Sequence, residues 1–240
     1  MDPPFPPAVI LAGGLGTRLR PVVEDLPKSM APVNGKPFLE RIVSLLSGKG
    51  IREFVFCVGY RREAILGYFG DGSGWNVRIR YATEEEPLGT GGAVRNALPL
   101  LDGTFLLLNG DTYLDVDYSE FLEYHRQKVR KERCVGSVAL VSTQERQFFG
   151  SVTTGKNWRI ASFSEKSPDA VGRGWINGGV MCLEPMVLRF IPPDMPSSLE
   201  RDVIPAAISA GGGFFGFPVQ GDFVDIGTPE GYRKIQEILV

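Results

Sequence analysis

The sequence contains a single histidine, His125, among its 240 residues. This residue lies in YSEFLEYHRQK, where apolar residues recur at helical spacing, so we expect His125 at a solvated position of an amphipathic helix. A hydrolase that depends on a histidine general base, such as a Ser-His-Asp enzyme, is therefore disfavoured. Any catalysis by this chain has to proceed without such a base or depend on this one residue.

Cysteine, excess charge and long apolar runs are also scarce. The three cysteines (Cys57, Cys134 and Cys182) are far apart and lie in apolar contexts, which predicts buried free thiols and no metal-type spacing. A net charge of -2 disfavours nucleic acid and anionic membranes as partners. No apolar run approaches the roughly 18 residues that span a bilayer, and the proline-rich N-terminus does not resemble a signal peptide. We expect a cytoplasmic protein.

What the sequence does contain is a regular alternation of short apolar strands and helices from about residue 8 to 135. Repeated strand–helix units predict an α/β fold with a doubly wound, mostly parallel, Rossmann-like sheet. TFLLLNGD is the most apolar strand and is expected at the centre of the sheet. From about 136 to 240 strands dominate, and we expect them to complete the mixed sheet, add a smaller β-rich lobe and end in a helix. No linker separates the halves, so residues 1–240 are predicted to form one domain.

A glycine-rich loop, GGLGTR, follows the first strand. Clustered glycines let backbone N–H groups converge on phosphate oxygens, and Arg18 and Lys28 add positive charge, so the loop suits a polyphosphate. The dinucleotide-binding pattern fails because Leu19 occupies its third glycine position. The P-loop pattern fails because Arg18 occupies its second glycine position. A glycine turn without a ligand is the alternative.

Two aspartates stand directly after apolar strands. Asp111 ends LLLNGD and Asp225 lies in FVDIG. The carboxyl ends of strands in open α/β sheets gather at one edge, and two carboxylates together with phosphate oxygens and water suit Mg²⁺. The alternative is that each aspartate caps a turn, as we expect for the neighbouring Asp115 and Asp117.

Several motifs, in order, resemble those of the sugar-1-phosphate nucleotidyltransferases. They are AVILAGGLGTRL, LPKSMAPVNGKPFLE, EEEPLGTGGA, LNGDTYLDVD, SFSEKS, INGGVM and FVDIGTPEGY. This resemblance implies a GT-A-like nucleotidyltransferase fold, with a nucleotide-binding half over about 8–135 and a sugar-binding half over about 136–240. It also implies a reaction that joins a nucleoside triphosphate to a sugar 1-phosphate and releases pyrophosphate. Within the family the similarity is greatest to guanylyltransferases that use GTP and a heptose 1-phosphate, followed by those that use mannose 1-phosphate.

The resemblance also implies roles for particular residues. Asp111 and Asp225 would hold Mg²⁺, Lys28 and Arg18 would bind the triphosphate, and Lys166 would orient the sugar phosphate. The implied nucleotide-binding residues are Leu11, Ala12, Gly13, Gly14, Gly16, Thr17, Arg18, Lys28, Glu84, Pro87, Leu88, Gly89, Asn109 and Gly110. The implied sugar-phosphate-binding residues are Gly150, Glu165, Lys166, Asn177 and Gly178.

Two further expectations have open alternatives. Glu84 is placed to accept hydrogen bonds from the N1–H and N2–H of guanine, although EEE is equally typical of a solvated acidic turn. Phe214, Phe215 and Tyr232 either mark the subunit contact of a homodimer or belong to the core.

Overall fold

The computed structural model describes residues 5–14, 26–164, 170–193 and 195–239. Its central feature is a mixed sheet of nine strands in the described part of the chain, in the order β10-β9-β11-β6-β1-β4-β5, with β8 paired to β11 and β12 paired to β8. The strands of this sheet are β1 Ala8–Leu11, β4 Glu53–Val58, β5 Arg78–Thr83, β6 Phe105–Asn109, β8 Cys134–Thr143, β9 Ser151–Thr154, β10 Ile160–Ser164, β11 Gly174–Leu183 and β12 Gly213–Val219.

Strands β5, β4, β1 and β6 run parallel to one another, as the strand–helix alternation predicts. The predicted central position of TFLLLNGD is confirmed, since β6 lies between β1 and the antiparallel β11. The α-helices are α1 Phe38–Gly48, α2 Arg62–Phe69, α3 Gly89–Ala97, α4 Tyr118–Glu132, α5 Ile204–Ser209 and α6 Pro229–Ile238.

Helices cover both faces of the sheet, which makes it doubly wound. Alternate residues of β1 point to opposite faces, so Ile10 packs in the core cluster that holds residues of α1, α2 and α4. Val9 packs in the second cluster, with residues of α3 and α5. The predicted burial of the three cysteines is confirmed, and all three are free thiols. None of the helices in the described ranges has the length and apolarity needed to cross a bilayer.

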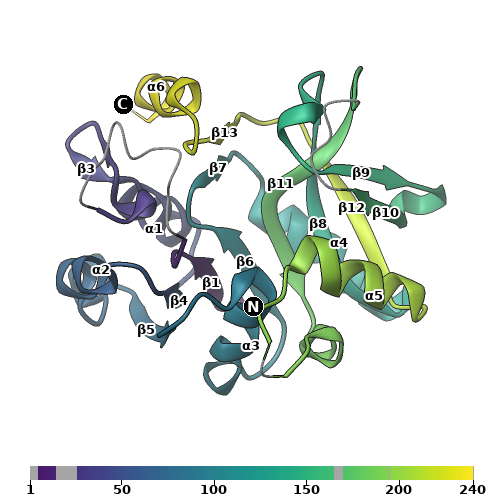
Figure 1. The fold of residues 1–240 in the computed structure, drawn as a ribbon, viewed down its shortest axis with the longest axis horizontal. Coiled ribbons are helices and arrows are strands. Elements are labelled where there is room, and N and C mark those ends of the chain that lie inside the picture. The colour runs from purple at the N-terminus through teal and green to yellow at the C-terminus, as the bar shows by residue number, and fades with distance from the viewer. Residues whose placement is uncertain (1–4, 15–25, 165–169, 194, 240) are drawn as a thin grey trace.

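The second half of the chain extends the same sheet. Strands β8, β9, β10 and β12 lie together on the side away from α1 and α2 (Figure 1). A separate two-stranded sheet joins β7 (Thr112–Leu114) to β13 (Phe223–Asp225).

Phe214 and Phe215 are fully buried, so these two aromatic side chains belong to the core and offer no free surface for a subunit contact. The homodimer itself stays a prediction.

The expectation of a solvated His125 is wrong. Its side chain is 1% exposed because it follows Tyr118, Phe121 and Leu122 at helical spacing on the apolar face of α4. His125 Nδ1 lies 2.9 Å from the hydroxyl of Ser137, and Nε2 lies 3.0 Å from Glu184 Oε1. The histidine therefore joins α4 to the sheet through buried polar contacts.

This contact predicts an acid-sensitive component of stability. The hydrogen bond from His125 lowers the pKa of Glu184 below its ordinary value, so the unfolded chain binds more protons than the folded protein at acidic pH. The stabilisation from Glu184 is present above its unfolded pKa and is lost as the pH falls through the lowered folded pKa. We expect Glu184→Gln to flatten the decline of melting temperature below about pH 5. A decline with the same slope in the variant would contradict this role, and Glu120→Gln, at an exposed position of α4, is the control.

Candidate active site

Two aspartates and a lysine that are distant in the sequence meet at the carboxyl end of β6. Lys28 Nζ lies 2.6 Å from Asp111 Oδ2 and 3.3 Å from Asp225 Oδ1. The Lys28 side chain is 12% exposed, so its ammonium group is largely withdrawn from solvent. The two carboxylates therefore already share one cation.

The small β7–β13 sheet brings the two aspartates together. Asp225 pairs with Thr112, the residue that follows Asp111, in the antiparallel register of these strands. The backbone N–H of Ile226 also donates a hydrogen bond to the carbonyl oxygen of Asp111 at 3.0 Å. Backbone pairing thus determines the separation of two side chains that lie more than a hundred residues apart in the sequence.

Neighbouring groups orient both carboxylates. Asp225 Oδ1 accepts a hydrogen bond from the backbone N–H of Gly227 at 2.7 Å, and Asp111 Oδ1 accepts one from the Thr112 hydroxyl at 3.2 Å. A Cβ atom at Gly227 would lie 2.1 Å from Lys28 Nζ. The glycine of FVDIG therefore leaves the space that the lysine occupies.

This donor set fits a hard divalent cation. The described residues contain no group of three or more histidine, cysteine, aspartate or glutamate side chains suited to hold a metal. Two carboxylates would leave most coordination positions to phosphate oxygens and water, which is how Mg²⁺ is commonly bound in proteins that act on phosphates.

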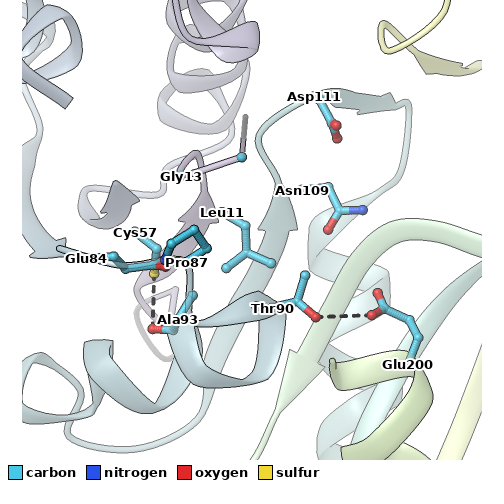
Figure 2. Close-up of a pocket in the computed structure, with 12 residues that line it drawn as sticks. Leu11, Gly13, Cys57, Glu84, Pro87, Thr90, Ala93, Asn109, Asp111 and Glu200 are labelled. Atoms are coloured by element: carbon cyan, nitrogen blue, oxygen red, sulfur yellow. Dashed lines mark hydrogen bonds between the residues drawn. The ribbon is translucent and has the colours of Figure 1, made fainter. Parts of the chain in front are cut away.

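A cavity of about 400 Å³ lies beside these groups, between the start of α3 and the ends of β1 and β6 (Figure 2). Of the predicted nucleotide-binding residues, those that line it are Leu11, Gly13, Gly14, Glu84, Pro87, Gly89 and Asn109, together with the predicted metal ligand Asp111. Four further residues line this cavity that no site prediction from the sequence included, namely Cys57, Thr90, Ala93 and Glu200.

Glu84 stands at the end of this cavity away from Asp111 (Figure 2). Its Oε2 accepts a hydrogen bond from the backbone N–H of Leu88 at 2.9 Å, and burial raises the pKa of its carboxyl group. A Cβ atom at Gly13 would lie 3.3 Å from Glu84 Oε1, so the glycine loop and this carboxylate approach each other closely. Glu84 is therefore a half-buried acceptor in the cavity wall and not a fully solvated turn residue.

A second cavity, of about 280 Å³, adjoins the first and shares Asn109, Asp111 and Glu200 with it. Of the predicted sugar-phosphate-binding residues, Gly150 and Asn177 line it, and so does Asp225. Its remaining lining residues were not identified from the sequence; they are Thr112, Phe149, Phe163, Ser164, Ser198 and Phe223. The two cavities therefore meet along Asn109, Asp111 and Glu200.

A bend in β11 places Asn177 in the second cavity. The pairing of β11 with β8 changes register between Asn177 and Met181, and the backbone at Gly179 has a φ of 76°. Asn177 Oδ1 accepts a hydrogen bond from the N–H of Gly179 at 2.9 Å, which leaves the amide NH₂ of Asn177 as a donor. A Cβ atom at Gly178 would lie 2.9 Å from Leu114, so packing within the chain accounts for this glycine.

Among the described residues, five more of the predicted site residues line neither cavity, namely Ala12, Lys28, Leu88, Gly110 and Gly178. Ala12 and Gly110 make backbone hydrogen bonds at the ends of β1 and β6, to the carbonyl oxygens of Cys57 and Leu11 respectively. Some of the predicted residues lie outside the described part of the chain, namely Gly16, Thr17, Arg18, Glu165 and Lys166.

A segment from the second half of the chain is held against the start of α3. Ser197 donates its N–H to the carbonyl oxygen of Leu88 at 2.9 Å and accepts the N–H of Gly91 at 2.8 Å. The N–H of Leu199 donates to the Thr90 hydroxyl at 2.8 Å. The turn beside Glu84 and the segment of Ser198 and Glu200 thus form one connected wall across both cavities.

This contact makes Gly89 important for stability. Gly89 has a φ of 72°, and a Cβ atom there would lie 2.5 Å from the carbonyl oxygen of Ser197. We expect Gly89→Ala to lower the free energy of unfolding by about 3 kcal/mol, measured by urea denaturation, because it adds both backbone strain and a steric clash. Gly48→Ala is the control, since Gly48 is in a helix with nothing within 4 Å of its Cβ position. Equal stability of the two variants would contradict the prediction.

Known proteins that are similar in sequence to this chain are nucleotidyltransferases. The profile of the Nucleotidyl transferase family matches residues 7–240. A D-glycero-alpha-D-manno-heptose 1-phosphate guanylyltransferase from Aneurinibacillus thermoaerophilus is 36% identical over 233 residues, which cover 97% of each chain. A mannose-1-phosphate guanylyltransferase from Mycobacterium tuberculosis is also 36% identical, over 229 residues, and the match covers 95% of this chain and 62% of that protein's length.

A solved structure is similar over the whole chain. HddC from Yersinia pseudotuberculosis, complexed with GMP-PN, superimposes with a TM-score of 0.84 at 33% identity, covering 98% of this chain and 100% of that one. The predicted GT-A-like fold and the resemblance seen in the sequence motifs are therefore confirmed. The chain belongs to the nucleotidyl transferase family.

Proposed function

We propose that this protein transfers a guanylyl group from GTP to D-glycero-D-manno-heptose 1-phosphate, giving GDP-heptose and pyrophosphate. The observation that carries the proposal is the 36% identity to a heptose 1-phosphate guanylyltransferase along nearly the full length of both proteins. Two adjoining cavities that meet at Asp111 support it, because such a reaction must bring two phosphorylated substrates together.

The chemistry suits a site without a histidine base. A sugar phosphate has a second pKa near 6 and is largely ionised at pH 7, so no side chain has to deprotonate it. Its oxygen attacks the α-phosphorus of GTP, a new P–O bond forms, and the bond from the α-phosphorus to the bridging oxygen breaks. The bonding electron pair leaves with pyrophosphate. His125 lines neither of the two cavities, in keeping with this mechanism.

Catalysis in this mechanism is positioning and charge neutralisation. Asp111 and Asp225 would hold Mg²⁺, which supplies Lewis-acid charge neutralisation when bound. Lys28 and Arg18 would bind the β- and γ-phosphates that leave. Lys166 would bind the sugar phosphate and Glu165 the sugar hydroxyls, with Asn177 and Gly150 beside them.

Guanine is the proposed base because Glu84 can accept hydrogen bonds from N1–H and N2–H. Uracil and thymine do not present this pair of donors. Competition between GTP, ITP, UTP and dTTP would test the assignment, since inosine lacks the N2 amino group. We expect wild-type protein to prefer GTP, and Glu84→Gln to reduce that preference about tenfold.

Mannose 1-phosphate is the second candidate substrate. The mycobacterial mannose-1-phosphate guanylyltransferase is as similar in identity as the heptose enzyme, although this chain spans only 62% of it. A uridylyl- or thymidylyltransferase is a more distant alternative. In each case the protein would act in the cytoplasm and supply a nucleotide sugar for polysaccharide synthesis.

A screen of pyrophosphate release would test the proposal directly. GTP, ITP, UTP and dTTP are each paired with heptose, mannose, glucose and N-acetylglucosamine 1-phosphates in the presence of Mg²⁺. We expect the highest kcat/KM for GTP with the heptose 1-phosphate. Absence of turnover with every pair would refute the proposed function. A higher kcat/KM for mannose 1-phosphate than for the heptose 1-phosphate would make mannose 1-phosphate the acceptor.

A further inference from the structure

Glu200 is a carboxylate at the boundary of both cavities, and none of the roles described above involves it. It lies in the short π-helical turn Leu199–Val203 and is half-buried. Its Oε2 accepts hydrogen bonds from the hydroxyls of Thr90 and Ser198, each at 3.2 Å. Two hydroxyls from opposite halves of the chain therefore hold the carboxylate in a defined orientation.

No lysine or arginine among the described residues forms an ion pair with Glu200. Three carboxylates of the described residues line the second cavity, and the other two, Asp111 and Asp225, both pair with Lys28. An unpaired carboxylate repels phosphate groups but is a strong acceptor for hydroxyl groups. The ligand group beside Glu200 is therefore expected to carry hydroxyls.

The position of Glu200 relative to the cations agrees with this expectation. Figure 2 shows Asn109 between Asp111 and Glu200 along one wall of the site, so Glu200 lies beyond the region where the phosphates would be neutralised. Ser198, which donates to Glu200, lines the second cavity and not the first. Asn177 lines that same cavity and offers a donor to the same ligand.

We propose that Glu200 is a specificity-determining residue, whose carboxylate accepts a hydrogen bond from a hydroxyl group of the acceptor sugar. This inference rests on the proposed function and adds a residue to it. The contacts of Ser197 and Leu199 with the start of α3 keep the carboxylate in place when the sugar binds. Sugars that lack the hydroxyl, or present it in the opposite configuration, would leave Glu200 without its donor and bind more weakly.

The test compares Glu200→Gln with wild-type protein in steady-state kinetics. We expect the KM for the heptose 1-phosphate to rise about tenfold or more, because a hydrogen bond to a charged acceptor is replaced by a weaker one. The KM for GTP should stay within about twofold, and Glu120→Gln, exposed on α4, should leave both values unchanged. The variant should also discriminate less than wild type between sugar 1-phosphates that differ at a single hydroxyl.

Three outcomes would overturn the inference. A rise in the KM for GTP, with lost discrimination against 2′- or 3′-deoxy-GTP, would assign Glu200 to the ribose. Unchanged KM values would remove it from recognition. A lower melting temperature with a fall in kcat alone would indicate a structural role.

Calorimetric titration of the heptose 1-phosphate separates this inference from the proposed function, because it does not require turnover. If wild-type protein binds the sugar phosphate but releases no pyrophosphate, the proposed function fails. The dissociation constant of the sugar phosphate is measured for wild-type protein and for Glu200→Gln, and the ratio of the two values decides the role of Glu200. A ratio near one would overturn this role. No binding of the sugar phosphate to either protein, together with no pyrophosphate release, would refute both statements.

Discussion

Asp111→Asn is expected to lower kcat by about a thousand-fold, because it would remove one of the two carboxylates proposed to hold Mg²⁺ and with it several kcal/mol of charge stabilisation. Asp225→Asn should have an effect of the same order, since both carboxylates contact the same Lys28 ammonium group and therefore lie close enough together to hold one ion. Both variants should remain folded, as asparagine preserves the shape of the side chain. The measurement is pyrophosphate release as a function of Mg²⁺ concentration, with the melting temperature recorded for each variant.

Asp115→Asn is the matched control for this experiment. Asp115 is four residues from Asp111, is exposed, and lines neither of the two cavities. We expect its kcat and Mg²⁺ dependence to match those of wild type. If Asp111→Asn and Asp225→Asn also turned over at wild-type rates, both residues would have to be removed from the mechanism.

Lys28→Met is expected to have two opposite effects. It should lower kcat/KM for GTP by about a hundred-fold or more, because the ammonium group that would bind the leaving phosphates is lost. In the structure, however, the same ammonium group forms ion pairs with the two carboxylates that would hold Mg²⁺. Removing Lys28 should therefore tighten the binding of a divalent cation to the free protein.

Thermal melting with and without Mg²⁺ measures the second effect. Asp111 and Asp225 would face each other without a neutralising cation in Lys28→Met, so the metal-free variant should melt below wild type. Added Mg²⁺ should raise its melting temperature more than that of wild type. Lys131→Met, exposed on α4, provides the control. An equal response to Mg²⁺ in Lys28→Met and wild type would show that the lysine and the metal do not compete.

Much of the fold could be predicted because its signals are local. The alternation of apolar strands and helices predicted the parallel part of the sheet, and the apolar character of TFLLLNGD predicted the central strand β6. The position of His125 could not be judged from its polarity, although its spacing from Phe121 and Leu122 placed it on the buried face of α4. Helical periodicity was the stronger signal, because a polar residue on an apolar face can be satisfied by buried partners such as Ser137 and Glu184.

Parts of the site that depend on distant pairing escaped prediction. Glu200 lies in a stretch without a recognised motif, and it reaches the cavities only because Ser197 pairs with the turn before α3. The glycines of GTGG could be interpreted as helix-packing or ligand-binding residues. In the structure, Gly89 and Gly91 closely approach the carbonyl oxygen and the hydroxyl of Ser197, whereas Gly92 closely approaches the Leu88 side chain.

The linear order of residues was sufficient to establish the family, the strand–helix core and the identity of the charged side chains, since each depends on short-range patterns. The pairing of β7 with β13 brings Asp111 and Asp225 together beside Lys28. The wall that the two cavities share depends on a second pairing, between residues 197–199 and residues 88–91. Backbone hydrogen bonds between distant segments decide such distances, and no local pattern in the chain encodes them.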